Sequence, residues 1–214
     1  MPDWNELRQR AAERYEDGAA RLPDDADARQ RQLTRMGNAA GAAGLAELMD
    51  GRDGREWFTR AAERYRQSWE QAPPGSWGRP IGAIKARVLA GDWEGAADDA
   101  RWALEAGAAD SDSPIGRYAA ALAFGVLGQW DDLRVQADVA RTHETVPSEV
   151  ADALAFVAAE DVVGYAEAIE AVLESFETRD KYLEDMPVAD TVLVLQALAA
   201  RRGMVVELES ELLP

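Results

Sequence analysis

The fold of this chain is decided by residues 80–104, which read PIGAIKARVLAGDWEGAADDARWAL. Proline is favoured in the first turn of a helix, so Pro80 marks where one helix opens. Apolar residues then recur every three or four positions until Gly91-Asp92 interrupts the pattern, and a second helix begins at Trp93. The stretch therefore predicts two helices joined by a tight turn.

The same arrangement returns further along the chain. Residues 114–130 read PIGRYAAALAFGVLGQW, so the Pro-Ile-Gly tripeptide recurs after 34 residues and the turn glycine, Gly128, follows Gly91 after 37. A third, weaker unit runs from Pro147 through a turn at residues 159–162. A period in the thirties with helix–turn–helix units is typical of a helical solenoid, in which successive helix pairs stack on one another.

The first 73 residues are also helical in pattern, but they lack this period. Three helices are predicted there, ending near Pro23, Gly51 and Ala72, and Pro73-Pro74-Gly75 separates them from the repeats. We therefore predict an all-α chain with a helical region over 1–73 and a repeat array over 76–214, together one continuous domain.

Two details of these helices are also predicted. Gly37, Gly41 and Gly44 recur on one helix face, which indicates close helix packing. After a last unpaired helix from Pro187 to Arg202, we expect either a short strand or an extended tail.

The turns resemble those of a known repeat family. Gly91-Asp92-Trp93-Glu94-Gly95-Ala96, followed by Ala103-Leu104, is similar to the turn and second helix of tetratricopeptide repeats, and residues 128–132 are a weaker copy. The Leu-Gly…Tyr element of the first helix is missing and the closing proline stands elsewhere. The resemblance is thus to a divergent array over about residues 76–203. It implies antiparallel helix pairs in a right-handed solenoid with one extended inner surface for a partner.

The charge balance excludes one class of partner. The chain has 40 acidic and 23 basic residues, a formal net charge of -17, and its only lysines are Lys85 and Lys181. This composition, with its abundant alanine, resembles that of proteins from salt-loving archaea; a GC-rich acidic bacterium is the alternative source. General nucleic-acid binding needs clustered cations and is not expected.

The setting is predicted to be cytoplasmic. No stretch approaches the roughly 18 consecutive apolar residues of a membrane span, and the N-terminus has no basic region followed by an apolar one. We therefore expect neither membrane association nor secretion. The chain has no cysteine, which excludes thiol nucleophiles and disulfides and fits a reducing compartment.

No group of residues forms a catalytic signature. His143 is the only histidine, and we interpret it as an exposed residue at a helix end. The segments Asp24-Asp25-Ala26-Asp27 and Asp110-Ser111-Asp112-Ser113 lack the glycine and glutamate of a calcium loop, and we interpret them as helix caps. The sequence thus predicts no catalytic residue, no metal site and no cofactor.

One segment stands out as a candidate partner-binding surface, because it gathers a tryptophan and several cations in an acidic chain. Tryptophan and arginine commonly anchor protein interfaces. The candidates are Trp77, Arg79, Lys85, Arg87 and Arg117. The alternative interpretation is that Trp77 packs between two subregions and that the cations pair with neighbouring carboxylates.

The C-terminal stretch carries a second resemblance. Phe176-Glu177, Asp190-Thr191-Val192-Leu193, Leu198-Ala199, Arg201-Arg202-Gly203-Met204 and Leu213-Pro214 are similar to the end of an all-helical immunity-protein family, the forty-ninth in the series named for bacterial polymorphic toxin systems. The likeness covers about forty residues. It implies that the protein neutralises a cognate toxin by binding it.

We therefore predict a non-catalytic interaction module for a protein or peptide partner, with immunity-like toxin neutralisation as its sharper form. The alternative is an enzyme or small-ligand binder that uses carboxylates and arginine in a pocket between helices. A continuous open groove with exposed aromatic residues would favour the first prediction. A deep, partly apolar pocket with converging charges would favour the second.

Overall fold

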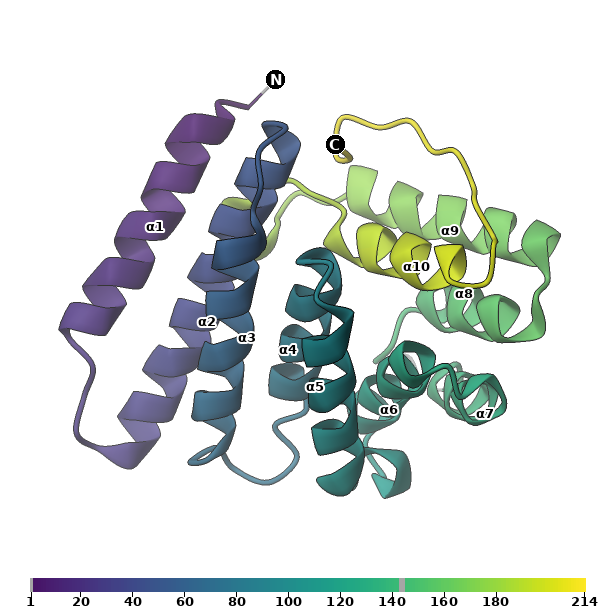
Figure 1. The fold of residues 1–214 in the computed structure, drawn as a ribbon, viewed down its shortest axis with the longest axis horizontal. Helices are drawn as coiled ribbons and strands as arrows, with labels where there is room; N and C mark the ends of the chain where they lie inside the picture. The colour runs from purple at the N-terminus through teal and green to yellow at the C-terminus, as the bar shows by residue number, and fades with distance from the viewer. Residues whose placement is uncertain (1, 143–144) are drawn as a thin grey trace.

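A computed structural model describes residues 2–142 and 145–214 of the chain. These residues form ten α-helices and two short 3₁₀ helices, and none of them lies in a strand, so the all-α prediction is confirmed (Figure 1). In chain order the elements are α1 (Trp4–Ala20), α2 (Ala26–Met49), α3 (Arg55–Trp69), α4 (Gly78–Leu89), α5 (Trp93–Glu105), η1 (Ala108–Asp110), α6 (Pro114–Leu127), α7 (Trp130–Ala140), α8 (Ser148–Ala159), α9 (Val162–Glu177), η2 (Leu183–Asp185) and α10 (Asp190–Ala200).

The helices from α1 to α9 pack in sequence, each against the next (Figure 1). The even-numbered helices α2, α4, α6 and α8 also contact one another, each touching the next in the series. We call these four helices the inner layer. Each odd-numbered helix from α3 to α9 packs against the even-numbered helices before and after it. The array therefore has two layers.

The predicted turns have the expected local chemistry. Asp92 caps α5 by accepting a hydrogen bond from the backbone N–H of Gly95 at 2.9 Å. Gly91 and Gly128 both adopt left-handed backbone, with φ of 68° and 72°, which glycine tolerates without steric penalty. Glu160 holds the corresponding place in the third unit with φ 55°. The weaker third turn thus keeps the geometry of the first two without their glycine.

The break at Pro73-Pro74-Gly75 does not separate two cores. Helix α3 packs on α4 across it, and the rings of Trp69 and Trp77 lie 5.4 Å apart between their centroids. The buried ring of Tyr65, on α3, lies against Gly37 of α2 and Gly82 of α4. Helices α2 and α3, before the break, and helix α4, after it, therefore share a packed interface.

The last helix is shorter than predicted and lies across the inner layer. It begins at Asp190 rather than Pro187, because residues 186–189 run extended and the Ala189 N–H donates to the Leu212 carbonyl at 3.0 Å. Helix α10 contacts α4, α8 and α9, and its Leu198 lies beside Gly125 of α6. Residues 204–210 form an extended tail and not a short strand, the other form expected from the sequence.

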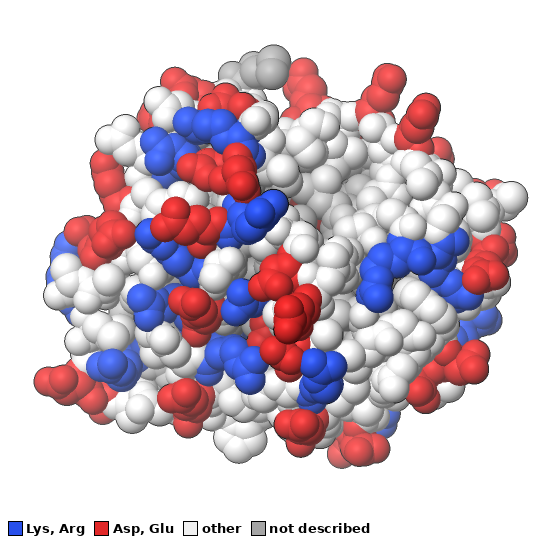
Figure 2. Space-filling model, in the orientation of Figure 1, with Lys and Arg blue, Asp and Glu red and all other residues white. Residues whose placement is uncertain are grey.

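Charges of both signs alternate over the face of the molecule in Figure 2. Several arginines pair with a carboxylate four residues earlier or later on the same helix, as Arg60 does with Glu56 and Arg134 with Asp138. Such pairs between exposed side chains add little stability. In the part of the chain that the structure describes, no helix combines the length and apolar character needed to cross a membrane.

Candidate functional site

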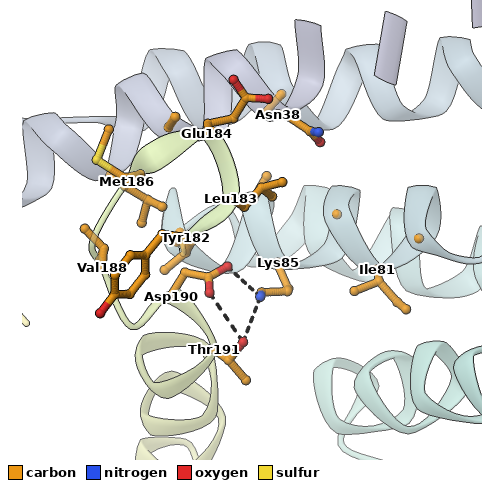
Figure 3. Close-up of a pocket in the computed structure, with 18 of the residues that line it drawn as sticks. Asn38, Ile81, Lys85, Tyr182, Leu183, Glu184, Met186, Val188, Asp190 and Thr191 are labelled. Atoms are coloured by element: carbon orange, nitrogen blue, oxygen red, sulfur yellow. Dashed lines mark hydrogen bonds and ion pairs between the residues drawn. The ribbon is translucent and has the colours of Figure 1, made fainter. Parts of the chain in front are cut away.

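The inner side of the array holds a pocket of about 560 Å³. Side chains from all four helices of the inner layer line it, together with α3, the end of α9 and the start of α10. Figure 3 shows lining residues of α2, α4 and α10 and of the segment before α10. This volume lies within the range of about 300–1,000 Å³ typical of ligand-binding sites. The apolar part of the lining includes Leu45, Phe58, Ile81, Leu89, Ile115, Val150, Met186 and Val188.

One wall of the pocket is the segment that joins α9 to α10, residues 178–189, which we call the return segment. It crosses the inner side from α9 to the first helices, where Met186 and Val188 are buried against α1 and α2. Arg14 of α1 holds it by a 2.9 Å ion pair with Glu184 and a 3.2 Å hydrogen bond to the carbonyl of the same residue. The return segment and α10 therefore fill part of the inner side and leave a bounded pocket.

The return segment contains an unusual piece of backbone. Glu184 and Asp185 are successive non-glycine residues with φ of 56° and 58°. This left-handed region is uncommon for such residues and needs support from the surrounding structure. The buried side chain of Met186 and the Arg14–Glu184 pair supply that support. Leu183 is 69% exposed at the rim of the pocket.

The three glycines of α2 differ in what they face. A Cβ at Gly37 would lie 2.9 Å from the ring of Tyr65, and one at Gly44 would lie 2.8 Å from the ring of Phe58, so these two glycines permit close helix packing as predicted. Gly41 lines the pocket, and a Cβ there would have no neighbour within 4 Å. The close-packing interpretation is therefore wrong for Gly41. Because this residue has no side chain, the space before it stays part of the pocket.

One polar group in the pocket joins α4 to α10. The Lys85 ammonium lies 2.6 Å from the Asp190 carboxylate and donates to the Thr191 hydroxyl at 3.0 Å (Figure 3). Burial lowers the pKa of Lys85, but the charge of the Asp190 carboxylate, its hydrogen bond to Lys85 and the nearby Tyr118 together outweigh burial, and the pKa is raised overall. Burial also raises the pKa of Tyr118, which lines the same wall and keeps its hydroxyl proton. Lys85 is therefore charged and neutralised by Asp190.

A second polar group lies nearer to α2 and α3. The Arg79 side chain donates through Nε to the Ser68 hydroxyl at 2.9 Å and through a terminal nitrogen to the Gln30 side-chain oxygen. Burial lowers the pKa of Arg79. The Tyr65 hydroxyl donates to Asn38 at 2.8 Å, and burial raises the pKa of Tyr65.

The five residues singled out from the sequence do not form one surface. Arg79 and Lys85 both line the pocket. Trp77 is only 7% exposed and packs against Trp69, so it is not available on the surface. Arg87 turns away towards Asp92 and Asp99 at 2.9 and 3.5 Å.

Arg117, the fifth of these residues, is also engaged within the fold. It bonds the Ala109 carbonyl and lies 3.3 Å from the Gln136 side chain. The interpretation that Trp77 packs between subregions thus matches the structure. For Arg87 the pairing with neighbouring carboxylates also matches.

The pocket residues that the sequence did not single out include several from the return segment and the start of α10. Tyr182, Leu183 and Asp190 are examples (Figure 3). Their only local signal is the break in helical pattern before Pro187, and nothing in it indicates which surface the segment meets. His143 lies outside the described residues.

A second hollow lies between α9 and the C-terminal tail. It is lined largely by carboxylates: Glu167, Glu170, Glu174, Glu177, Glu207 and Glu209. Among the residues placed by the structure, no cluster of three or more histidine, aspartate or glutamate side chains has a geometry that could hold a metal ion. Asp25 belongs to one of the two acidic segments that we interpreted as helix caps. It does cap α2, since its side chain accepts a hydrogen bond from the Ala28 N–H at 2.8 Å.

Comparison of the chain with protein-family models, with curated proteins and with solved structures found no match.

Proposed function

We propose that this protein is a non-catalytic binding module and that a compact ligand occupies its inner pocket. The observation that carries the proposal is the bounded, mostly apolar pocket of about 560 Å³ on the inner layer, with a few polar groups converging on it. Such a combination is the usual form of a small-ligand site. The return segment and α10 favour a compact ligand over an extended one, because they occupy part of the inner side.

The polar groups of the pocket support binding more than catalysis. Asp190 is paired with Lys85, and Glu184 is paired with Arg14. A general base needs a carboxylate or amine that is free to accept a proton near neutral pH. Each of these two carboxylates forms an ion pair with a cation, which suits a structural or recognition role.

A protein partner is the second candidate, and the repeat architecture favours it. Arrays of stacked helix pairs commonly bind other proteins on their inner surface. The resemblance to immunity proteins predicts that this partner would be a toxin-like protein. The stretch that carries the resemblance includes Asp190 and Thr191, which line the pocket.

Gly41 offers a direct test, because it is the pocket glycine of α2 with open space before it. Gly41→Phe should fill the pocket while leaving the helix interfaces intact, and Gly41→Ala is the matched control. Each tagged protein would be isolated from its host in molar potassium chloride, and bound small molecules and proteins would be identified by mass spectrometry after denaturation.

We expect one compound to copurify with the wild type and with Gly41→Ala, in an amount nearly equimolar with the protein. The same compound should be absent from Gly41→Phe. A protein with the same dependence would support the second candidate. If everything bound to the wild type is also bound to Gly41→Phe, while both melt as single folded species, the pocket is not the binding site.

A further inference from the structure

Among the described residues that line the inner pocket, positive charges outnumber negative ones. Three of these residues are cations, Arg79, Lys85 and Arg179, and two are carboxylates, Glu184 and Asp190. The chain as a whole has 40 acidic residues against 23 basic ones, so an excess of positive charge at one place is contrary to its composition. A pocket of this kind is suited to a ligand that carries negative charge.

Of the pocket cations, Arg79 and Arg179 have no carboxylate of the described residues within ion-pair distance. Arg179 is exposed and hydrogen-bonds Ser175. Arg79 is partly buried, and its hydrogen-bond partners among the described residues are the uncharged side chains of Ser68 and Gln30. Lys85, by contrast, has Asp190 at 2.6 Å. A carboxylate of a ligand would supply the missing counter-charge at Arg79.

The Arg79 side chain is also held in place. Ser68, which accepts from its Nε, in turn donates to the Gln30 carbonyl at 2.7 Å and lies 2.8 Å from the Thr34 hydroxyl. This network joins α2, α3 and α4 and fixes the planar guanidinium on one edge. The other terminal nitrogen, Nη1, donates to none of the described residues, and a guanidinium edge matches the two oxygens of a carboxylate.

The distance along α4 sets the size of what can lie beside Arg79. Lys85 follows Arg79 by six residues, or about 9 Å along the helix axis. Ile81 and Gly82 lie between these two cations on α4, with the ring of Tyr65 against Gly82, and all three residues line the pocket. Gly41, which has open space before it, lines the pocket from α2. An aliphatic chain of about eight carbons spans this length at about 1.25 Å per carbon.

We infer that the ligand of the inner pocket is an apolar carboxylic acid, whose carboxylate pairs with Arg79 and whose hydrocarbon lies along the wall towards Lys85. The inference rests on the proposed function, since it names the chemistry of the ligand for the same pocket. Lys85 and Asp190 neutralise each other at the far end, so they do not compete for the carboxylate.

The test compares three probes of equal chain length: octanoate, octanol and octylammonium. Binding to the full chain would be measured by isothermal titration calorimetry at one fixed high ionic strength. We expect octanoate to bind at least about tenfold more tightly than octanol, and octylammonium to bind most weakly. Gly41→Phe should abolish the binding of all three probes.

Arg79→Gln should remove the advantage of octanoate over octanol while leaving octanol unchanged. Arg79→Lys keeps the charge and should retain part of the advantage, which separates loss of charge from loss of folding. Arg134→Gln, at an exposed cation paired with Asp138, is the control and should change nothing. Circular dichroism would verify that each variant melts cooperatively.

The outcomes separate the two proposals. If octanol binds as tightly as octanoate and Gly41→Phe abolishes both, the pocket binds apolar ligands and the carboxylate inference is overturned. An octanoate advantage that survives in Arg79→Gln overturns the assignment of Arg79. If octanoate binds equally well to Gly41→Phe, the pocket itself, and with it the proposed function, is rejected.

Discussion

Arginine has opposite surroundings in two regions of the molecule: the contacts between the two layers, and the pocket on the inner side. Arg87 and Arg79 lie eight residues apart on α4. Between the layers, Arg87 meets the carboxylates of Asp92 and Asp99. At the pocket, Arg79 meets only neutral side chains among the described residues. Residue type alone therefore does not tell a structural cation from one that is available to a ligand.

The end of α10 shows how completely arginine can be used within the fold. Arg201 and Arg202 stack on the rings of Trp93 and Trp130 at 4.6 and 4.7 Å, so two adjacent residues reach the equivalent turn tryptophans of successive units. Arg201 also bonds carbonyls at the end of α6 and Arg202 carbonyls at the end of α8. A positive charge at a helix C-terminus is stabilising. These two arginines fasten α10 to the array.

The largest expected effect comes from breaking this attachment. Arg202 is 14% exposed and donates to the carbonyls of Val157 and Ala158 at 3.1 and 2.6 Å. Arg202→Ala leaves those carbonyls without their charged donor, and we expect a loss of about 2–3 kcal/mol in the free energy of unfolding. Urea unfolding followed by far-ultraviolet circular dichroism would measure it.

Arg134→Ala is the matched control, because among the described residues that exposed arginine pairs only with Asp138 on its own helix. It should cost at most about 0.5 kcal/mol. Equal losses in the two variants would show that α10 is held by its apolar face alone.

Two glycines on the pocket walls, Gly82 and Gly41, differ in whether a side chain added there would meet a neighbour or open space. A Cβ at Gly82 would lie 2.6 Å from the ring of Tyr65, whereas one at Gly41 would meet nothing within 4 Å. Gly82→Ala should therefore lower the free energy of unfolding by about 1–3 kcal/mol through overpacking. Gly41→Ala should raise it by about 0.5–1 kcal/mol, because alanine is the better helix former.

Thermal and urea unfolding of the two alanine variants, side by side, would check both signs. Stabilisation in both would mean that Tyr65 can move away from α4, and the wall at Gly82 would then be softer than its geometry implies.

The sequence predicted most of the architecture because the signals for it are local. The turns at Gly91 and Gly128, the cap at Asp92 and the periodic apolar residues each depend on neighbours within a few positions. The start of α10 was predicted too early because residues 186–189 are held extended by distant partners, including the carbonyl of Leu212. Local pattern carries no information on such contacts.

The site was predicted only in part for the same reason. Arg79 and Lys85 stood out as cations in an acidic chain, and both line the pocket. The residues that complete the site come from far along the chain: Lys85 and Thr191 are 106 positions apart, and Arg14 and Glu184 are 170 apart. The burial of Trp77 between subregions was predicted as one of two alternatives, and its neighbour Trp69 was not identified because it lies across a proline break that marks a boundary in the sequence.

The smallest expected effect concerns Asp99, where the pairing of charges between the layers is incomplete. Asp99 is 1% exposed; its Oδ1 accepts from Arg66 at 2.7 Å, but its Oδ2 accepts no hydrogen bond from the described residues and lies 3.5 Å from Arg87. Burial raises the pKa of Asp99 above its ordinary value of 3.8 and outweighs the two arginines, which lower it. The folded state then binds more protons than the unfolded state between the two pKa values.

The contribution of Asp99 to stability is therefore fully present below its unfolded pKa and is lost as pH rises through its folded pKa. Subtracting the unfolding free energy of Asp99→Asn from that of the wild type isolates this group from the other carboxylates. We expect the difference to fall as pH is raised from about 3.5 to about 7. A difference that rises instead would mean that Arg66 and Arg87 outweigh burial in their effect on the pKa of Asp99. The charges between the layers would then be fully matched, in contrast with Arg79 at the pocket.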